Sequence, residues 1–271
     1  MPSTFLQRAV KRSAAAADRL RPPRRGIVVL IYHRVGGGSG LAVDLSPDLF
    51  EAQMALLARE RRAAPLDTAL DVLPTRATPA RDPVVVTFDD GTTDFVDVAL
   101  PVLERHRVPA TIYVATDFLE TGRPFPHGGM PLSWSALRDA LATGLVTVGS
   151  HTHTHALLDR VTSPEAEEEI ERSIGLIGER LQVEAEHFAY PKAVRGSLAA
   201  ETVVRRRFRS GALAGTRPNA YGRTDPHRLA RSPVQVADGM RWFRHKADGG
   251  MALEDDLRRI LDRRRYAGTT T

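Results

Sequence analysis

Acidic and imidazole side chains follow two apolar runs that lie far apart in the chain. Asp89 and Asp90 stand at the end of one run, and His151 and His155, four residues apart, follow another. One carboxylate and two histidines form a ligand set for a catalytic zinc that keeps an open position for water. The second carboxylate is then free to act as a base, so the pattern predicts a metal-dependent hydrolase.

Apolar runs that alternate with helical patterns must position these side chains. We expect strands at residues 27–32, 84–88, 110–115, 145–149 and 187–190, because continuous apolar runs are typical of parallel strands buried on both faces. Between them, serine-containing start signals predict helices that begin near residues 46, 133 and 163. Phe50, Met54 and Leu57 share one face of the first helix and are expected in the core.

This alternation of strands and helices predicts a parallel α/β fold, either a barrel or a doubly wound sheet. The candidate functional residues favour the barrel, because each of them follows or ends an apolar run: His33, Asp89, Asp90, His151 and Tyr190. The carboxyl ends of barrel strands open onto one face, where active sites are built. Residues 119–132, which contain several glycines and prolines, are expected to form a long loop over that face.

The net charge of +5 is concentrated at the two ends of the 271-residue chain. Residues 1–25 carry seven basic side chains against one acidic side chain, and a second basic cluster lies at residues 258–265. A nucleic-acid-binding domain would instead carry a basic face, so we consider that class the least favoured. We interpret residues 1–25 as a basic N-terminal extension and residues 26–271 as a single domain, a length that α/β barrels commonly reach.

The sequence predicts neither a secretory signal nor a membrane-spanning helix. No stretch approaches the roughly 18 apolar residues of a transmembrane helix, and no apolar segment follows the basic N-terminus before Pro22-Pro23. We therefore expect a cytoplasmic protein whose basic N-terminus suits peripheral contact with an anionic membrane surface or an acidic partner. The chain has no cysteine, which excludes disulfides and thiolate metal ligands.

Two motifs resemble those of a known enzyme family. Residues 87–91, Thr-Phe-Asp-Asp-Gly, and residues 151–155, His-Thr-x-x-His, are similar to the first two motifs of the NodB-type polysaccharide deacetylases, carbohydrate esterase family 4. Residues 30–34, Leu-Ile-Tyr-His-Arg, resemble the circularly permuted branch that includes the poly-N-acetylglucosamine deacetylases. The resemblance covers about residues 26–235. It implies a distorted (β/α)7–8 barrel with the active site at the carboxyl ends of the strands.

The resemblance also implies roles for individual residues. Asp90, His151 and His155 would bind a divalent metal, usually Zn2+, although Co2+, Ni2+ or Mn2+ would fit the same ligands. Asp89 would be the general base. The family's usual C-terminal Leu-x-His motif is absent after Ala230. We therefore expect His33 to be the acid that protonates the leaving amine, with His245 as the alternative.

The third motif of the family takes an unusual form here. In residues 188–192, Phe-Ala-Tyr-Pro-Lys, Ala189 stands where the family has an arginine that orients the base carboxylate. Another group must then orient the carboxylate of Asp89. We expect that group to be Arg231, with Asp225 beside it.

The remaining residues of this motif are expected near the substrate. By resemblance, Tyr190 and Pro191 belong to the substrate site, and the backbone N–H of Lys192 would help to stabilise the oxyanion. The Lys192 side chain places a cation where stacking on a sugar ring would be expected, and this argues against a long neutral glycan. His153, two residues from each histidine ligand, is expected in an exposed loop.

Three hypotheses of function remain. The leading one is a carbohydrate deacetylase that removes an N-acetyl group from an N-acetylhexosamine-containing glycan or glycoconjugate. The second keeps the fold and the metal but acts on an N-acyl or N-formyl small molecule or a lipid-linked sugar. The third is a non-catalytic glycan-binding protein. The presence of both Asp89 and Asp90 argues against it, because a binding protein needs no base beside a metal.

Overall fold

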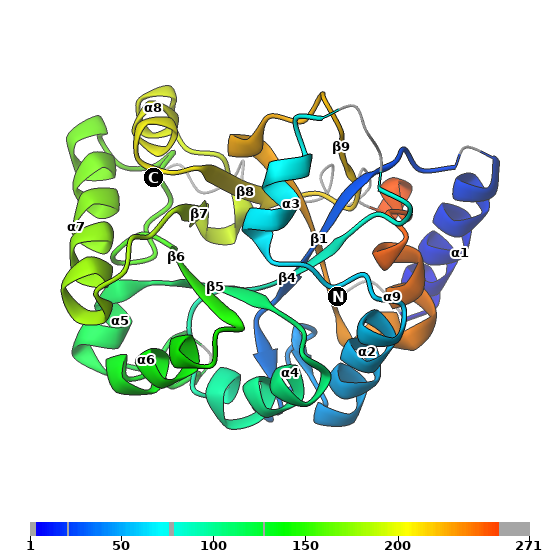
Figure 1. Cartoon of the computed structure of the whole chain (residues 1–271), viewed down its shortest axis with the longest axis horizontal. Coiled ribbons are helices and arrows are strands. Elements are labelled where there is room, and N and C mark those ends of the chain that lie inside the picture. The colour runs from blue at the N-terminus through cyan, green and yellow to red at the C-terminus, as the bar shows by residue number, and fades with distance from the viewer. Residues whose placement is uncertain (1–3, 21, 76–78, 127, 255–271) are drawn as a thin grey trace.

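The chain folds into a closed barrel of parallel strands with helices around it (Figure 1). The structure is a computed structural model and describes residues 4–20, 22–75, 79–126 and 128–254. The C-terminal basic cluster at residues 258–265 lies outside these described residues. Within the described ranges, no helix combines the length and the apolar character that crossing a bilayer requires.

Seven parallel strands form the barrel in the order β1-β4-β5-β6-β7-β8-β10, and β10 pairs with β1 to close it. The pairing of Val29 with Arg231 lies at this closure. A short strand, β9, runs antiparallel to the start of β1. The barrel strands and β9 are Gly26–Tyr32 (β1), Val84–Phe88 (β4), Ala110–Val114 (β5), Val146–Ser150 (β6), His187–Ala189 (β7), Ser210–Ala214 (β8), Asn219–Ala220 (β9) and Leu229–Pro233 (β10).

The barrel is filled by side chains and closed at one end by a helix. All residues of β1, β4 and β5 are buried, and each fully buried valine or leucine contributes about 1.5–3 kcal/mol. Inward side chains such as Val29, Val85 and Tyr113 pack in one cluster with α3 (Leu66–Val72). Figure 1 shows α3 across the centre of the barrel. This helix covers the end where the strands begin, so the opposite end is left to carry a site.

The other helices pack around the outside. Ser46 accepts a hydrogen bond from the N–H of Leu49 and so caps α2, which buries Phe50, Met54 and Leu57 as expected. A short two-stranded sheet, Arg34–Val35 (β2) with Asp44–Leu45 (β3), follows β1. The outer helices are α2 (Pro47–Arg59), a π-helical turn (Phe95–Ala99) that continues into α4 (Leu100–His106), α5 (Thr116–Thr121), α6 (Trp134–Ala142), α7 (Ser163–Leu181), α8 (Leu198–Arg207) and α9 (Gly239–Ala247).

The expected barrel is confirmed, with seven strands in its closed ring. Each of the five predicted strands lies within one residue of its observed bounds, and so do the three predicted helix starts. The strands β8, β9 and β10 were not predicted. The sequence of β8, Ser-Gly-Ala-Leu-Ala, is too weakly apolar to stand out. Of the expected loop at residues 119–132, the described residues begin as the end of α5 and then continue without a further helix before α6.

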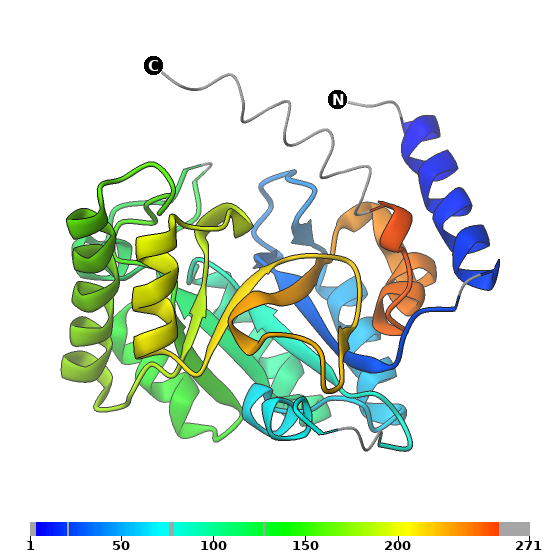
Figure 2. The same cartoon turned by 90° about the horizontal axis from the view of Figure 1, so that it is seen from above.

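The N-terminal segment packs on the barrel domain as helix α1 (Thr4–Leu20). Figure 2 shows this helix beside α9. Lys11 is buried and forms ion pairs with Asp238 at 2.5 Å and Glu254 at 2.7 Å. Ala14 packs in one apolar cluster with Trp242. The segment interpreted as an extension is therefore, over residues 4–20, a helix attached to the domain, and one of its cations serves an internal ion pair.

Candidate metal centre and active site

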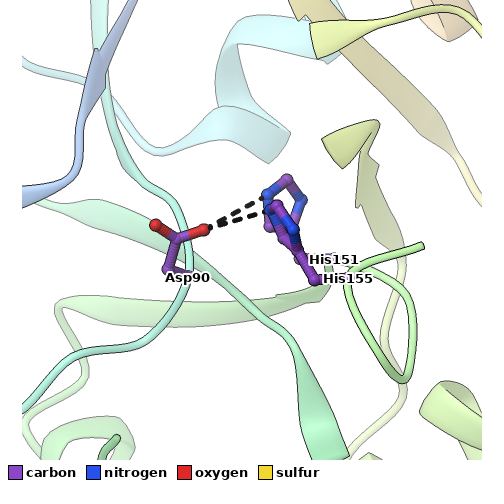
Figure 3. A group of neighbouring side chains, drawn as sticks. All are labelled: Asp90, His151 and His155. Atoms are coloured by element: carbon purple, nitrogen blue, oxygen red, sulfur yellow. Dashed lines mark ion pairs between the residues drawn. The ribbon is translucent and has the colours of Figure 1, made fainter. Parts of the chain in front are cut away.

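Three side chains from two barrel strands meet where those strands end (Figure 3). Asp90 follows β4, while His151 and His155 follow β6. The Oδ1 atom of Asp90 lies 3.6 Å from Nε2 of His151 and 3.5 Å from Nε2 of His155. Two ligand atoms on a tetrahedral zinc, each at 2.0–2.1 Å, are about 3.4 Å apart. The spacing of these donor atoms therefore fits a zinc ion.

The backbone at this cluster adopts conformations that non-glycine residues rarely take. Asp90 has φ +77° and His155 has φ +66°, in the left-handed region that costs most residues free energy. The fold holds both positions. The carbonyl of Asp90 accepts from the N–H of Ala115, and the N–H groups of His153 and Thr154 donate to the Glu169 carboxylate on α7. Such strained, well-held backbone is typical of functional sites.

A hydrogen bond orients His151, and burial keeps His155 uncharged. His151 donates its Nδ1–H to the carbonyl of Ala189 at 2.7 Å, which fixes the ring and leaves the Nε2 lone pair facing Asp90. Burial of His155, together with the nearby His151, lowers the pKa of His155 to about 4. Near neutral pH its imidazole is therefore uncharged, the form that binds metals.

Asp89 pairs with Arg231, the residue expected to orient it. Asp89 is 5% exposed and Arg231 is fully buried. The two form a bidentate pair, in which Nη1 and Nη2 of Arg231 donate to the two carboxylate oxygens at 2.6 and 2.8 Å. Burial alone would raise the pKa of Asp89, but the Arg231 guanidinium outweighs it and the pKa falls to about 2. Arg231, on β10, thus contacts the carboxylate that Ala189 cannot reach.

Thr87 and Tyr113 also contact this pair, and the sequence did not predict their role. Nη1 of Arg231 also donates to Oγ1 of Thr87, at 3.1 Å. The guanidinium lies 5.1 Å from the centre of the Tyr113 ring, close enough for a cation–π contact. Polar residues inside otherwise apolar strands, such as Thr87 on β4 and Tyr113 on β5, were the available signal.

His33 lies at the same end of the barrel, directly after β1. Its charged form is among the groups that lower the pKa of Asp89, so the two side chains are electrostatic neighbours. The Nδ1 atom of His33 is buried and has no hydrogen-bond partner in the described part of the chain. A buried nitrogen without a partner is costly in a folded protein and is therefore a candidate for contact with a substrate.

The residues predicted around the third motif are distributed differently. The Tyr190 ring packs on Phe188, with ring centres 4.9 Å apart, in the core outside the barrel. Its side chain therefore faces away from the metal cluster. Pro191 is buried, whereas Lys192 is exposed and turns the backbone at φ +52°.

Asp225 lies elsewhere, and the expectation that it accompanies Arg231 is wrong. It precedes the start of β10, at the opposite end of the barrel from Asp89. There its carboxylate pairs with Arg205 and accepts a hydrogen bond from the N–H of His227. The physical reason is strand direction: Asp225 and Arg231 are close in sequence, but β10 carries them to opposite ends.

The expectation that His153 is exposed is also wrong. The side chain is buried, and its Nδ1 atom forms a 2.9 Å hydrogen bond with Oγ1 of Thr116. This contact ties the histidine-containing loop to the start of α5. Glu169, on α7, accepts hydrogen bonds from the backbone of this loop.

Comparisons with known proteins relate this chain to deacetylases. Residues 76–206 match the family model described as polysaccharide deacetylase. The matched segment contains Asp89, Asp90, His151 and His155, while His33 and Arg231 lie outside it. A Bacillus subtilis (strain 168) protein described as "Putative polysaccharide deacetylase YxkH" is 26% identical over 214 residues, which cover 78% of this chain and 72% of that protein.

Two solved structures share the fold. The deacetylase PplD of Streptococcus pyogenes, in complex with acetate, aligns with a TM-score of 0.73 at 21% identity, covering 83% of this chain and 99% of that one. IcaB from Ammonifex degensii aligns with a TM-score of 0.71 at 25% identity, covering 82% and 97%. The sequence matches and the shared barrel agree: residues 76–206, a little under half of the chain, match the polysaccharide deacetylase model, and the chain is similar to this family of hydrolases.

Proposed function

We propose that this protein is a metal-dependent deacetylase that removes the N-acetyl group from an N-acetylhexosamine unit of a glycan or glycoconjugate. The observation that carries the proposal is the adjacency of two groups. One is a three-ligand cluster, Asp90, His151 and His155, whose donor atoms are spaced for a divalent metal. The other is a carboxylate, Asp89, held ionised beside it by Arg231.

The metal is proposed to be Zn2+, because a set of two imidazoles and one carboxylate suits it, although Co2+, Ni2+ or Mn2+ could take the same ligands. When bound, the metal would lower the pKa of a water molecule and polarise the acetyl carbonyl. Asp89 would accept the proton of the attacking water. Its pKa of about 2 keeps it ionised across the physiological range, and the bidentate pair with Arg231 fixes the direction of its free lone pairs.

The leaving amine needs a proton, because an amide anion is a very poor leaving group. We assign this acid role to His33. Its buried Nδ1 has no partner among the described residues, and it is an electrostatic neighbour of Asp89. His245, the alternative acid, lies on α9 outside the barrel, where its ring packs 5.6 Å from that of Trp242. That position favours His33.

The proposed class of substrate depends on Lys192. The backbone N–H of Lys192 would stabilise the oxyanion, and its exposed ammonium stands beside the metal cluster, where it is among the charges that lower the pKa of His155. A cation at this place favours a glycoconjugate with an anionic group over a long neutral glycan. Contact of the basic N-terminus with an anionic membrane stays a prediction, and Lys11 adds nothing to it because its charge is buried.

The experiment that tests the proposed function is acetate release from short N-acetylglucosamine oligomers. The protein should release acetate, lose this activity after treatment with a chelator and regain it when zinc is added back. Asp89→Asn is the matched control for contaminating hydrolases. If acetate is not released but an N-formyl or N-acyl small molecule is hydrolysed, the second hypothesis replaces the first. If the protein binds metal and oligomers without hydrolysing anything, it is a binding protein.

The acid role of His33 has its own test. His33→Ala should retain metal and fold but lose most amide hydrolysis, while the loss on an activated aryl acetate is smaller because a phenolate leaves without a proton. The rate–pH profile on amides should also lose its high-pH limb. Equal losses on both substrates would assign His33 a structural or oxyanion role.

A further inference from the structure

A cleft of about 530 Å3 lies on the outside of the barrel, far from the metal cluster. Its floor includes Ala230, which points outward because its neighbours Leu229 and Arg231 point into the barrel. Its walls come from the segment before β1, from β9 and from the segment before β10. The lining residues include four arginines and one carboxylate: Arg24, Arg217, Arg223, Arg228 and Asp225.

The charge of this cleft is largely unneutralised. Asp225 is already paired with Arg205 and lies within 3.9 Å of Arg228. Among the described residues, no carboxylate lies within ion-pairing distance of Arg24, Arg217 or Arg223. All three side chains are exposed. Three exposed arginines without a carboxylate partner among the described residues therefore line the same opening.

The fold makes this cleft because the connection from β8 to β10 differs from the others. Where other barrel strands are followed by a packed helix, this connection supplies only β9 and a short 3-10 turn, Pro226–Arg228. The floor is nevertheless fixed. Asn219 donates to the carbonyls of Ile27 and Ala230, at 3.2 and 2.9 Å, and accepts from the N–H of Ala230 at 2.8 Å. The cationic side chains thus stand on a rigid, hydrogen-bonded frame.

We propose that this cleft binds a phosphate-bearing anion. Guanidinium groups bind phosphate oxygens with two parallel hydrogen bonds, and a charge-assisted bond of this kind is stronger than one between neutral groups. A volume of about 530 Å3 admits a group of the size of a diphosphate or a sugar phosphate. The ligand could be a free phosphate compound or the headgroup of an anionic phospholipid, and the chemistry of recognition is the same for both.

This site is separate from the proposed catalytic one. Its arginines precede β1 and β10, and Ala230 lies near the start of β10, whereas Asp89, Asp90 and the histidines follow β4 and β6. Because all barrel strands are parallel, the start of one strand and the end of another lie at opposite ends of the barrel. Occupation of the cleft should therefore leave the hydrolysis of a small soluble substrate unchanged.

The first experiment measures binding of inorganic pyrophosphate by calorimetry to the full chain. We expect saturable binding that weakens as salt is added, because the attraction is between exposed charges. In the double variant Arg217→Gln/Arg223→Gln, binding should fall about tenfold or more. The matched control is Arg59→Gln/Arg172→Gln, which removes two exposed arginines outside this cleft. It should bind as the unmodified protein does, and acetate release should be equal in all three proteins.

A second experiment separates the two sources of phosphate. Cosedimentation is compared with vesicles of phosphatidylcholine alone and of phosphatidylcholine mixed with phosphatidylglycerol. Binding to the anionic vesicles that is lost in the cleft variant but kept in the control assigns the site to a lipid headgroup. Pyrophosphate binding without vesicle binding assigns it to a free phosphate compound. Equal effects of the two double variants, or no binding in either experiment, would overturn the proposal.

Discussion

Among the residues that the structure describes, two buried carboxylates are neutralised by buried cations, yet only one of them lies at a candidate active site. Inside the barrel, Asp89 pairs with Arg231 through two hydrogen bonds. Outside it, Asp238 accepts from Lys11 at 2.5 Å and from Lys246 at 2.8 Å. Burial opposes ionisation in both places, and the cations outweigh it, so the pKa of each carboxyl is lowered.

The surroundings separate the two groups. Asp89 stands at the open end of the barrel beside the three side chains proposed to bind a metal. Asp238 is 1% exposed and lies in the segment after β10. Its ion pairs with Lys11 and Lys246 connect this segment to α1 and α9. A buried ion pair is therefore a poor indicator of function by itself. Access and neighbouring ligands decide whether it serves catalysis or holds elements together.

The largest effect is expected when a proposed metal ligand is removed. His151→Ala and His155→Ala should each abolish bound metal and acetate release while the barrel stays folded, because each removes one of three donors. Metal content by elemental analysis and circular dichroism check this. His153→Ala is the matched control from the same loop, since His153 bonds to Thr116, outside the ligand cluster. Full metal occupancy in either ligand variant would remove that histidine from the set.

Asp89→Asn should separate the base from the ligands. We expect it to keep its metal and to lose turnover by about 100-fold to 10,000-fold, the usual loss for a missing general base. Single-turnover kinetics with metal-loaded protein measure this. Loss of the metal in Asp89→Asn, with the metal retained in Asp90→Asn, would mean that the two carboxylates have exchanged roles.

Arg231→Met should change the pH dependence of the reaction. The folded-state pKa of Asp89, about 2, lies below its ordinary value of 3.8, so the pair stabilises the fold above that value and is lost as the pH falls toward 2. Without Arg231, burial raises the pKa of Asp89, and the acid limb of the rate–pH profile should move to higher pH. Arg231→Lys keeps the charge and should move it less. An unmoved limb in Arg231→Met would show that Arg231 does not orient the base.

The sequence predicted which candidate residues meet at one end of the barrel better than it predicted the contacts that hold them there. The proposed metal ligands and Asp89 follow apolar runs, and strand direction then brings them to one end of the barrel. Arg231 was predicted because Ala189 stands where the family has an arginine, so another cation was required. Asp225 was misplaced because closeness in sequence ignores strand direction. His153 was wrongly expected to be exposed because its burial depends on how α5 and α7 pack against the histidine loop, a tertiary contact that local pattern does not contain.

The smallest effects are expected at the outer cluster, and they should appear in stability alone. Asp238→Asn leaves Lys11 and Lys246 without their shared carboxylate, and removal of one partner from a buried ion pair costs about 3–5 kcal/mol. Chemical denaturation should show this loss. Metal content and the rate–pH profile should match those of the unmodified protein at temperatures where both are folded.

Lys11→Met tests the attachment of α1 more gently, because Lys246 still donates to Asp238. The variant removes the hydrogen bonds of Lys11 to Asp238 and Glu254, and a bond between charged groups contributes about 1.5–3 kcal/mol. Arg12→Met, at an exposed position of the same helix, is the control and should leave the denaturation midpoint nearly unchanged. If Lys11→Met instead shifts the rate–pH profile as Arg231→Met does, the outer cluster is coupled to catalysis and the distinction between the two carboxylates fails.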